Sequence, residues 1–279
     1  MSDGRRLLIA GCGSLGNQLG AGLVAEGWQV YGLRRNVAAL DPLIQPVAAD
    51  LAASSLPQLP PVDHIIYTAT PSGRDADAYR QAYLQGRENL LAALPPESTA
   101  RLIYVSSTGV YDCDDGRWVD EDSVPEPHTD TSKILLQAEQ LALRHGALVL
   151  RFAGIYGEQR RWLLRRAAED DLQCVIDPPQ WTNRIHQYDC VSALRHLLLQ
   201  PDSCGIYHAV DELPAPRYEV YAWLRQQLGL PPPTALTRTD GAGQGKRVRC
   251  ERLRSSGWRP RYPSYRDGYA ALLEDDDEA

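Results

Sequence analysis

Near its amino end the chain reads Leu7-Leu8-Ile9-Ala10-Gly11-Cys12-Gly13-Ser14-Leu15-Gly16. The short apolar run predicts a buried strand, and the residues from Leu15 to Ala25 predict a helix. The glycines between them fit the pattern G-x-G-x-x-G. In this pattern the first glycine allows a tight turn, the second lets a pyrophosphate approach the backbone, and the third lets helix and strand pack closely. The helix N-terminus adds free N–H groups. We therefore predict that Gly11, Gly13, Ser14, Leu15 and Gly16 bind a dinucleotide; the alternative is a turn without a ligand.

The second predicted strand indicates which dinucleotide is preferred. It covers residues 29–33 and ends at Leu33-Arg34-Arg35, about 20 residues after the glycines. An acidic side chain at this place would bind the adenosine ribose hydroxyls and repel a 2′-phosphate. The chain has two arginines instead, and guanidinium groups match phosphate geometry. We therefore predict that Arg34 and Arg35 select NADP(H) over NAD(H); the alternative is that both are solvated surface side chains.

Strands and helices alternate through the first half of the chain. Apolar runs that predict further strands lie at residues 42–50, 64–69, 102–106 and 147–152. Helices are predicted at residues 75–94 and 132–145, ended by Pro95-Pro96 and by Gly146. Runs that are apolar throughout are typical of strands buried on both faces by helices. The predicted fold class is therefore α/β, a doubly wound parallel sheet of the Rossmann type.

After Phe152 the alternation becomes looser, with short helical patches separated by turn-rich segments. We therefore expect an NADP-binding Rossmann domain at residues 1–155 and a smaller, substrate-binding C-terminal lobe at residues 156–279. The segment at about residues 186–200 is expected to pack back on the Rossmann domain.

Composition and charge exclude several classes of protein. With 43% hydrophobic and 23% charged residues among 279, the chain can bury a sizeable core. Its net charge of −7 argues against nucleic-acid binding, which requires a basic face, and no apolar run is long enough for a membrane span. The six cysteines and six histidines lack metal-binding spacing, so no metal is predicted. The first residues lack the apolar stretch of a leader peptide. We expect a cytoplasmic protein that acts on a small molecule.

Five further motifs follow the glycine turn in order. Asp50-Leu51 comes after the third strand, and Thr68-Ala69-Thr70 comes after the fourth. The others are Val105-Ser106-Ser107-Thr108-Gly109-Val110-Tyr111, Arg151-Phe152-Ala153-Gly154-Ile155-Tyr156-Gly157 and Ile185-His186-Gln187-Tyr188-Asp189. Through these motifs the chain resembles, from about Leu7 to Leu273, the extended short-chain dehydrogenase/reductases. This group contains the nucleotide-sugar epimerases and dehydratases.

The resemblance implies a hydride-transfer site built from serine, tyrosine and lysine. Ser107 matches the serine and Lys133 the lysine, but Thr129 stands four residues before Lys133, where the family has tyrosine. The resemblance also implies two sets of contacts: Asp50, Leu51, Ala69, Thr70, Lys133, Phe152 and Ile155 with the cofactor, and Ser107, Thr108, Tyr156 and Arg184 with the substrate.

The threonine leaves three accounts of the chemistry open. The pKa of a tyrosine, about 10, can be lowered by a nearby lysine and an oxidised cofactor, whereas an aliphatic hydroxyl starts far higher. In the first account another acid–base group acts, with Tyr111 and Tyr156 as candidates. In the second, Thr129 and Ser107 orient the substrate while water carries the proton. In the third, no proton is transferred and the protein binds NADP(H) as a sensor.

These observations lead to one expected function and one alternative. We expect an NADP-dependent oxidoreductase of the epimerase/dehydratase type, which transfers hydride to or from a nucleotide-sugar-like or small carbonyl substrate. The alternative is a non-catalytic NADP(H)-binding sensor or regulatory protein. The helices at residues 79–94 and 132–143 resemble the pair that forms the dimer interface in many family members, so a homodimer is also expected. Otherwise, their apolar stripes face only the sheet.

Overall fold

The computed structural model describes residues 5–239 and 243–277, and their contacts divide the chain into two compact units. Unit 1 contains the residues up to Val110, Pro127–Arg151 and Leu194–Ile206. Unit 2 contains Tyr111–Glu126, Phe152–Ala193 and the residues from Tyr207 onward. Each unit therefore joins segments that are distant in the sequence. The two-domain division expected at residues 155 and 156 stays a prediction.

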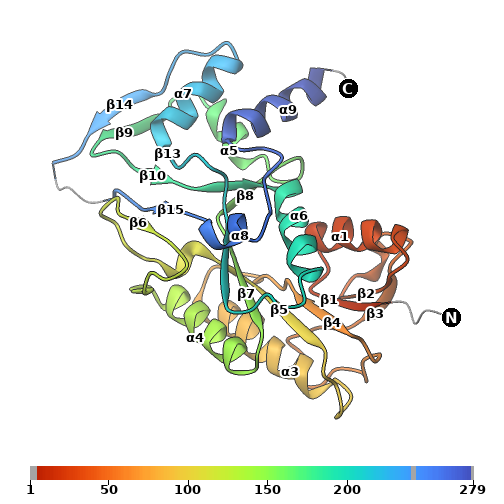
Figure 1. Ribbon diagram of the computed structural model, residues 1–279. Helices are drawn as coiled ribbons and strands as arrows, with labels where there is room; N and C mark the ends of the chain where they lie inside the picture. The colour runs from red at the N-terminus through yellow and green to blue at the C-terminus, as the bar shows by residue number, and fades with distance from the viewer. Residues whose placement is uncertain (1–4, 240–242, 278–279) are drawn as a thin grey trace. The chain divides into compact units, whose positions relative to one another are not determined.

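A seven-stranded sheet forms the centre of the α/β fold (Figure 1). Its strands are β1 (Arg6–Ala10), β2 (Gln29–Arg34), β3 (Gln45–Ala48), β4 (His64–Tyr67), β5 (Arg101–Ser107), β7 (Leu148–Phe152) and β12 (Ile206–Ala209). Their order in the sheet is β12-β7-β5-β4-β1-β2-β3. β1 pairs in parallel with both β2 and β4, so the strand order reverses at β1. A ligand is expected beyond the carboxyl end of such a strand. The predicted doubly wound parallel sheet is confirmed.

Helices cover both faces of the part of the sheet that belongs to unit 1. Figure 1 shows α1 (Ser14–Ala25) on one side of the strands, and α3 (Gly86–Ala92) and α4 (Asp130–Arg144) on the other. The core between the layers contains fully buried side chains such as Leu8 and Leu90. This double cover explains why the central strands are mostly apolar, as in the run Leu7–Ala10 of β1.

The helix after β4 differs from the single helix predicted at residues 75–94. It consists of α2 (Ala76–Tyr79), a π-helical segment (Arg80–Gln85) and α3. The buried Tyr67 hydroxyl donates a hydrogen bond to the carbonyl oxygen of Ala82, inside the π-helical segment. A Cβ on Gly86 would lie 2.6 Å from that hydroxyl oxygen, so the residue following the π-helical segment must be small. Insertion of a side-chain group into the helix ladder explains the wider turn.

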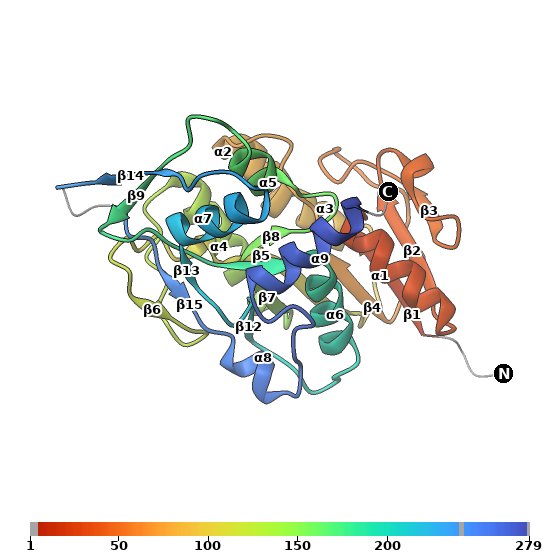
Figure 2. The same cartoon turned by 90° about the horizontal axis from the view of Figure 1, so that it is seen from above.

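Unit 2 is built from short elements. Its strands are β6 (Trp118–Val119), β8 (Gly154–Tyr156), β9 (Gln173–Asp177), β10 (Trp181–Thr182), β11 (Arg184–His186), β13 (Ala215–Pro216), β14 (Thr234–Thr237) and β15 (Arg247–Val248), which form two-stranded pairs. Its helices are α5 (Trp162–Ala167), α7 (Arg217–Gln227), α8 (Glu251–Ser255) and α9 (Tyr265–Asp277), while α6 (Gln187–Leu198) crosses the boundary between the units. Figures 1 and 2 show α5, α7 and α9 together, around a core that includes Tyr156, Leu224 and Tyr269. No helix of the described residues is long and apolar enough to cross a membrane.

Candidate functional site

The turn between β1 and α1 has the geometry that the glycine spacing predicts. Gly11 adopts a φ of +80°, and a Cβ at this position would lie 2.5 Å from the Cα atom of Ala69. Both facts exclude a side chain there. A Cβ on Gly16 would lie 2.9 Å from Cys12 Sγ and from Ile9 Cγ2, so this glycine allows α1 to pack closely on β1. The first and third glycines are thus explained by sterics within the turn.

The N-terminus of α1 is open to a ligand. Its N-cap is Gly13, no side chain caps it, and no acidic residue lies in its first turn. The nearest atom that a Cβ on Gly13 would meet is 3.8 Å away. The space beside the second glycine is therefore accessible to a group approaching the backbone, and the helix dipole favours an anionic group there.

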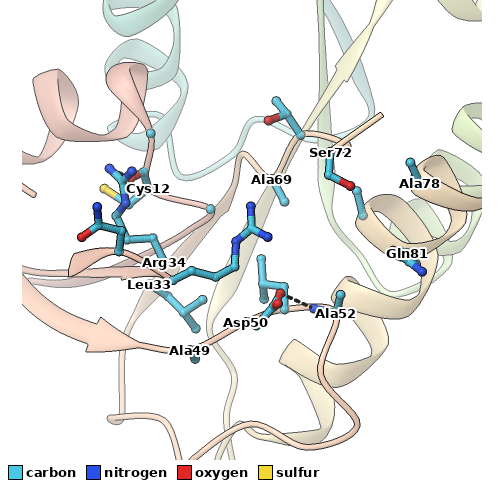
Figure 3. Close-up of a pocket in the computed structure, with 17 residues that line it drawn as sticks. Cys12, Leu33, Arg34, Ala49, Asp50, Ala52, Ala69, Ser72, Ala78 and Gln81 are labelled. Atoms are coloured by element: carbon cyan, nitrogen blue, oxygen red, sulfur yellow. Dashed lines mark hydrogen bonds between the residues drawn. The ribbon is translucent and has the colours of Figure 1, made fainter. Parts of the chain in front are cut away.

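A cavity of about 380 Å³ in unit 1 lies beside this turn, within the size range of ligand pockets. Its lining contains Gly11, Gly13, Arg34, Arg35, Asp50, Leu51, Ala69 and Thr70 from the predicted cofactor contacts. In Figure 3, Cys12 and Arg34 lie on one side of the cavity, with Ala78 and Gln81 opposite. Burial raises the pKa of the Cys12 thiol to about 11, so the thiol remains protonated at neutral pH. The structure thus brings together predicted contacts from the ends of β1, β2, β3 and β4.

The charged side chains around this cavity differ in the hydrogen bonds that they form. Arg34 donates from Nη1 to the carbonyl oxygens of Cys12, at 3.1 Å, and Ala39, at 3.3 Å. Arg35 is exposed and has no hydrogen bond or ion pair with any described residue. The carboxylate of Asp50 accepts a hydrogen bond of 3.0 Å from the Ala52 N–H. Two guanidinium groups therefore border the cavity at the end of β2, one of them uncommitted.

Other predicted cofactor contacts do not line this cavity. Leu15 and Gly16 are buried at the start of α1, directly after Ser14. Phe152 is buried at the end of β7, and Ile155 lines a different cavity, in unit 2. The cofactor roles of these residues stay predictions.

The three predicted catalytic residues of unit 1 have distinct surroundings. Ser107 Oγ accepts a hydrogen bond of 3.0 Å from the Gly109 N–H, and the following Thr108 is buried. Thr129 is the N-cap of α4: its hydroxyl oxygen accepts a hydrogen bond of 3.2 Å from the Ser132 N–H. The Lys133 side chain is 57% exposed, and its Nζ atom lies 4.0 Å from Asp130 Oδ1. The threonine hydroxyl is thus engaged in capping its helix.

The two tyrosines considered as alternative proton donors are buried in unit 2. Tyr111 donates to the carbonyl oxygen of Asp120 at 2.8 Å, and its hydroxyl lies 3.0 Å from His208 Nε2. Tyr156 stacks on Tyr269 with ring centroids 4.4 Å apart, and burial raises the pKa of Tyr156 far above its usual value. A hydroxyl with so high a pKa is a poor proton shuttle near pH 7.

The second cavity, of about 450 Å³, lies within unit 2 and is rich in arginine. Its lining includes Arg160, Arg166, Arg184 and Arg217, together with Tyr156 and Thr182. Arg184 is 3% exposed and donates from Nη2 to Thr182 Oγ1 at 2.5 Å, whereas its buried Nη1 has no partner. A buried donor that is left without an acceptor is costly. The cavity is therefore suited to an anionic group.

Burial perturbs three ionisable groups near this cavity. It lowers the pKa of Arg184 and raises the pKa of Asp211 to about 8, although each charge favours ionisation of the other. Burial, and then the Arg261 charge, lower the pKa of His186 to about 4, so this imidazole is neutral near pH 7. The histidine of the Ile185–Asp189 motif is packed against the ring of Tyr262, at a centroid distance of 4.3 Å.

Sequence reasoning missed several residues that line the two cavities. In unit 1 these include Asn36, Ser72 and Gln81, and in unit 2 they include Arg160, Arg166 and Arg217. Gln81 reaches the cavity from the π-helical segment, which has no sequence signal. The arginines of α5 and its preceding turn form a visible basic run, Arg160-Arg161 and Arg165-Arg166, that could have identified an anion site.

Residues 5–267 match a family model described as the RmlD substrate binding domain. The chain belongs to this family. Protein YeeZ of Escherichia coli K12 is 29% identical over an alignment of 278 residues, and the match covers 93% of this chain and 97% of YeeZ.

Two solved structures extend the comparison. A candidate NAD-dependent epimerase/dehydratase from Methylobacillus flagellatus is 30% identical, with a TM-score of 0.80 and coverage of 98% of this chain and 99% of that one. A short-chain dehydrogenase/reductase superfamily protein from Agrobacterium tumefaciens, solved with bound NAD, is 19% identical, with a TM-score of 0.80 and coverage of 98% of each chain. The latter likeness concerns the fold alone. The family match confirms the resemblance to the extended short-chain dehydrogenase/reductases.

Proposed function

We propose that this protein is an NADP(H)-dependent oxidoreductase of the epimerase/dehydratase type. The observation that carries the cofactor choice is the pair Arg34 and Arg35 beside the unit 1 cavity, where no acidic residue ends β2. The family membership supports an oxidoreductase, and the open glycine turn supports a dinucleotide. When bound, the nicotinamide supplies or accepts the hydride.

The residues present fit such a cofactor. The turn at Gly11 and the uncapped start of α1 offer a cradle for the diphosphate. Asp50 and Leu51 are proposed to meet the adenine, since both line the same cavity. The uncommitted guanidinium of Arg35 is available for a 2′-phosphate, to which arginine can donate two parallel hydrogen bonds.

The proposed substrate is nucleotide-sugar-like or a small carbonyl compound. The arginine-rich cavity of unit 2 favours the former, because the phosphates of a nucleotide sugar could accept a hydrogen bond from Arg184 Nη1, the buried donor that has no partner. Tyr156 shares this cavity and is proposed as a substrate contact. Phosphate-free carbonyl substrates remain the second class to test.

The proposed reaction site is atypical, with Thr129 in place of tyrosine. Ser107 is proposed to orient the substrate and Lys133 to hold the cofactor ribose, as the family resemblance implies. Thr129 can donate a hydrogen bond but caps α4, and both alternative tyrosines are buried. Water in the substrate site is the remaining carrier for the proton in the proposed reaction.

A second candidate function is a non-catalytic NADP(H)-binding sensor. It is favoured by the capping role of Thr129 and by the exposure of Lys133, whose ammonium faces Asp130 instead of a hydroxyl partner. In this case cofactor affinity would be retained while hydride transfer would be absent.

Turnover assays distinguish these functions. The full-length protein would be incubated with NADPH and, separately, with NADP⁺, together with a panel of nucleotide sugars and small carbonyl compounds or alcohols, and followed by cofactor fluorescence. Catalysis predicts turnover that is lost in Lys133→Ala and retained in Gln140→Ala, an exposed position on the same helix. Tight NADPH binding without turnover on any member of the panel would favour the sensor. Absence of binding to either nicotinamide dinucleotide would overturn both.

A further inference from the structure

Asn17 connects the first helix to the segment that carries the two arginines. It lies in α1 directly after Gly16, and its side chain is half-buried. Its Nδ2 atom donates to the carbonyl oxygen of Ala39 at 2.8 Å, and its Oδ1 atom accepts from the Asp41 N–H at 3.1 Å. One amide therefore holds two backbone groups of the connection between β2 and β3.

Arg34 holds the same connection from its other end. Its Nη1 atom donates to the Ala39 carbonyl oxygen, which also accepts from Asn17, and to the Cys12 carbonyl oxygen in the glycine turn. The position of residues 35–41 thus depends on a shared acceptor. Arg35 lies in this segment and is the guanidinium group that has no partner among the described residues.

We propose that Asn17 is a specificity-determining positioning residue for the 2′-phosphate of NADP(H). It does not touch the phosphate in this proposal; it fixes residues 35–41, so that Arg34 and Arg35 are held ready beside the cavity. The inference rests on the proposed function, which assigns the two arginines to that phosphate. Holding charged side chains in their binding arrangement strengthens binding because less conformational freedom is lost when the ligand arrives.

A merely structural role for Asn17 predicts a different result. If Asn17 only stabilised α1 or the glycine turn, its loss would weaken NADP⁺ and NAD⁺ alike, since both contain the diphosphate that the turn receives. A role in positioning the arginines affects only the cofactor that carries the 2′-phosphate. The ratio of the two affinities therefore separates the two roles.

The test uses calorimetric titration of the full-length protein with NADP⁺ and with NAD⁺. Asn17→Ala removes one donor and one acceptor and is expected to weaken NADP⁺ binding by about 10-fold, while NAD⁺ binding stays within about 2-fold of wild type. Gly22→Ala is the control, because it lies on the same helix and its added Cβ meets no atom within 4 Å. It should leave both affinities unchanged.

A second measurement needs no cofactor. Hydrogen exchange at the Asp41 amide should become faster in Asn17→Ala, because this amide loses its acceptor. Asn17→Asp keeps an acceptor for Asp41 but cannot donate to Ala39, so the NADP⁺ affinity should fall while protection of the Asp41 amide is largely retained. This variant also tests the inference if Asn17→Ala fails to fold.

The outcomes separate this inference from the function on which it rests. A wild-type protein that binds both dinucleotides equally would overturn the cofactor choice and the inference together. A wild-type preference for NADP⁺ that persists unchanged in Asn17→Ala and Asn17→Asp would overturn the inference alone. Equal weakening of both cofactors would assign Asn17 a structural role instead.

Discussion

Arg34 and Arg35 are adjacent in the chain but differ in the freedom of their guanidinium groups. Arg34 is tied to the carbonyl oxygens of Cys12 and Ala39, whereas Arg35 has no hydrogen-bonding partner among the described residues. A tied side chain is pre-organised, and a free one has all five donors available. The two arginines therefore contribute differently: Arg34 fixes the rim of the cavity and Arg35 is the principal candidate for phosphate contact.

The first prediction concerns Arg35→Ala. Because hydrogen bonds to charged groups contribute about 1.5–3 kcal/mol, NADP⁺ binding should weaken by about 10- to 100-fold. NAD⁺ binding should change by less than about 3-fold, since it lacks the extra phosphate. Calorimetric titration measures both, with Arg144→Ala as the control at an exposed position of α4. Equal losses for both cofactors would contradict the assignment.

The second prediction concerns the buried Asp211. Burial raises its pKa to about 8 in the folded state, against about 3.9 in an unfolded chain. Between these values the folded state binds a proton that the unfolded state has released, so this carboxyl makes stability fall as pH rises from about 4 to about 8. Above pH 8 its contribution levels off.

The asparagine variant isolates this effect. The side chain at position 211 of the Asp211→Asn variant is neutral at every pH. The free energy of unfolding of this variant should therefore fall less steeply between pH 5 and 8 than that of the wild type, and the two slopes should differ by up to about 1.4 kcal/mol per pH unit. Urea unfolding across this range measures the difference, in which other titrating groups cancel. Parallel stability curves for the two proteins would show that Asp211 is ionised throughout.

At the scale of the element, α4 carries the departure from the family pattern. A tyrosine at position 129 would be expected to present its ring toward a reaction site. Thr129 instead has an extended backbone, with φ −81° and ψ 154°, and is the N-cap of α4. Its hydroxyl satisfies the Ser132 N–H, one of the donors that a helix start leaves open. The threonine thus has a structural reason to be present.

The third prediction follows from this cap. Thr129→Ala should destabilise the protein by about 1 kcal/mol, because threonine is a favourable N-cap and alanine is not. Thr129→Ser keeps the cap and should restore most of the stability. Chemical denaturation of both variants measures the effect. If Thr129→Ala keeps wild-type stability but loses the turnover that Thr129→Ser retains, then the hydroxyl acts in the reaction and not only in the cap.

At the scale of the whole molecule, the expected homodimer remains a proposal. The helices around the π-helical segment and α4 keep several apolar side chains only half-buried: Tyr83, Leu84, Leu91, Leu136 and Leu141. A second copy of this chain would cover such side chains, and apolar area removed from water favours association. The alternative is that these side chains face only the sheet, as Tyr83 and Leu84 do where they pack on its core.

The fourth prediction concerns the mass in solution. Light scattering at micromolar concentration should give twice the 31.0 kDa of one chain. Leu136→Arg places a charge among the half-buried side chains of α4 and should lower the measured mass toward that of one chain. A wild-type mass of 31.0 kDa over the whole concentration range would reject the dimer.

Parts of the fold were readable from the sequence because their causes are local. The φ of +80° at Gly11 and the close contact of Gly16 with Cys12 are requirements that only glycine meets, so the spacing itself predicts the turn. The apolar runs Leu7–Ala10 of β1 and Ile65–Tyr67 of β4 likewise predict strands with helices on both faces. Where the local backbone conformation or local burial requires a certain residue type, a single sequence is enough to predict the structure.

Other features depend on contacts between residues far apart in the chain. Tyr67 donates a hydrogen bond to Ala82 inside the π-helical segment, and Asn17 forms hydrogen bonds with Ala39 and Asp41 in the segment that follows the two arginines. Arg160 and Arg217 meet in one cavity across a long stretch of sequence. The sequence alone determined the sheet, the glycine turn and the family. Only the tertiary structure decided which side chains line the cavities and which hydroxyls are engaged, because hydrogen bonding between distant segments exists only once the chain has folded.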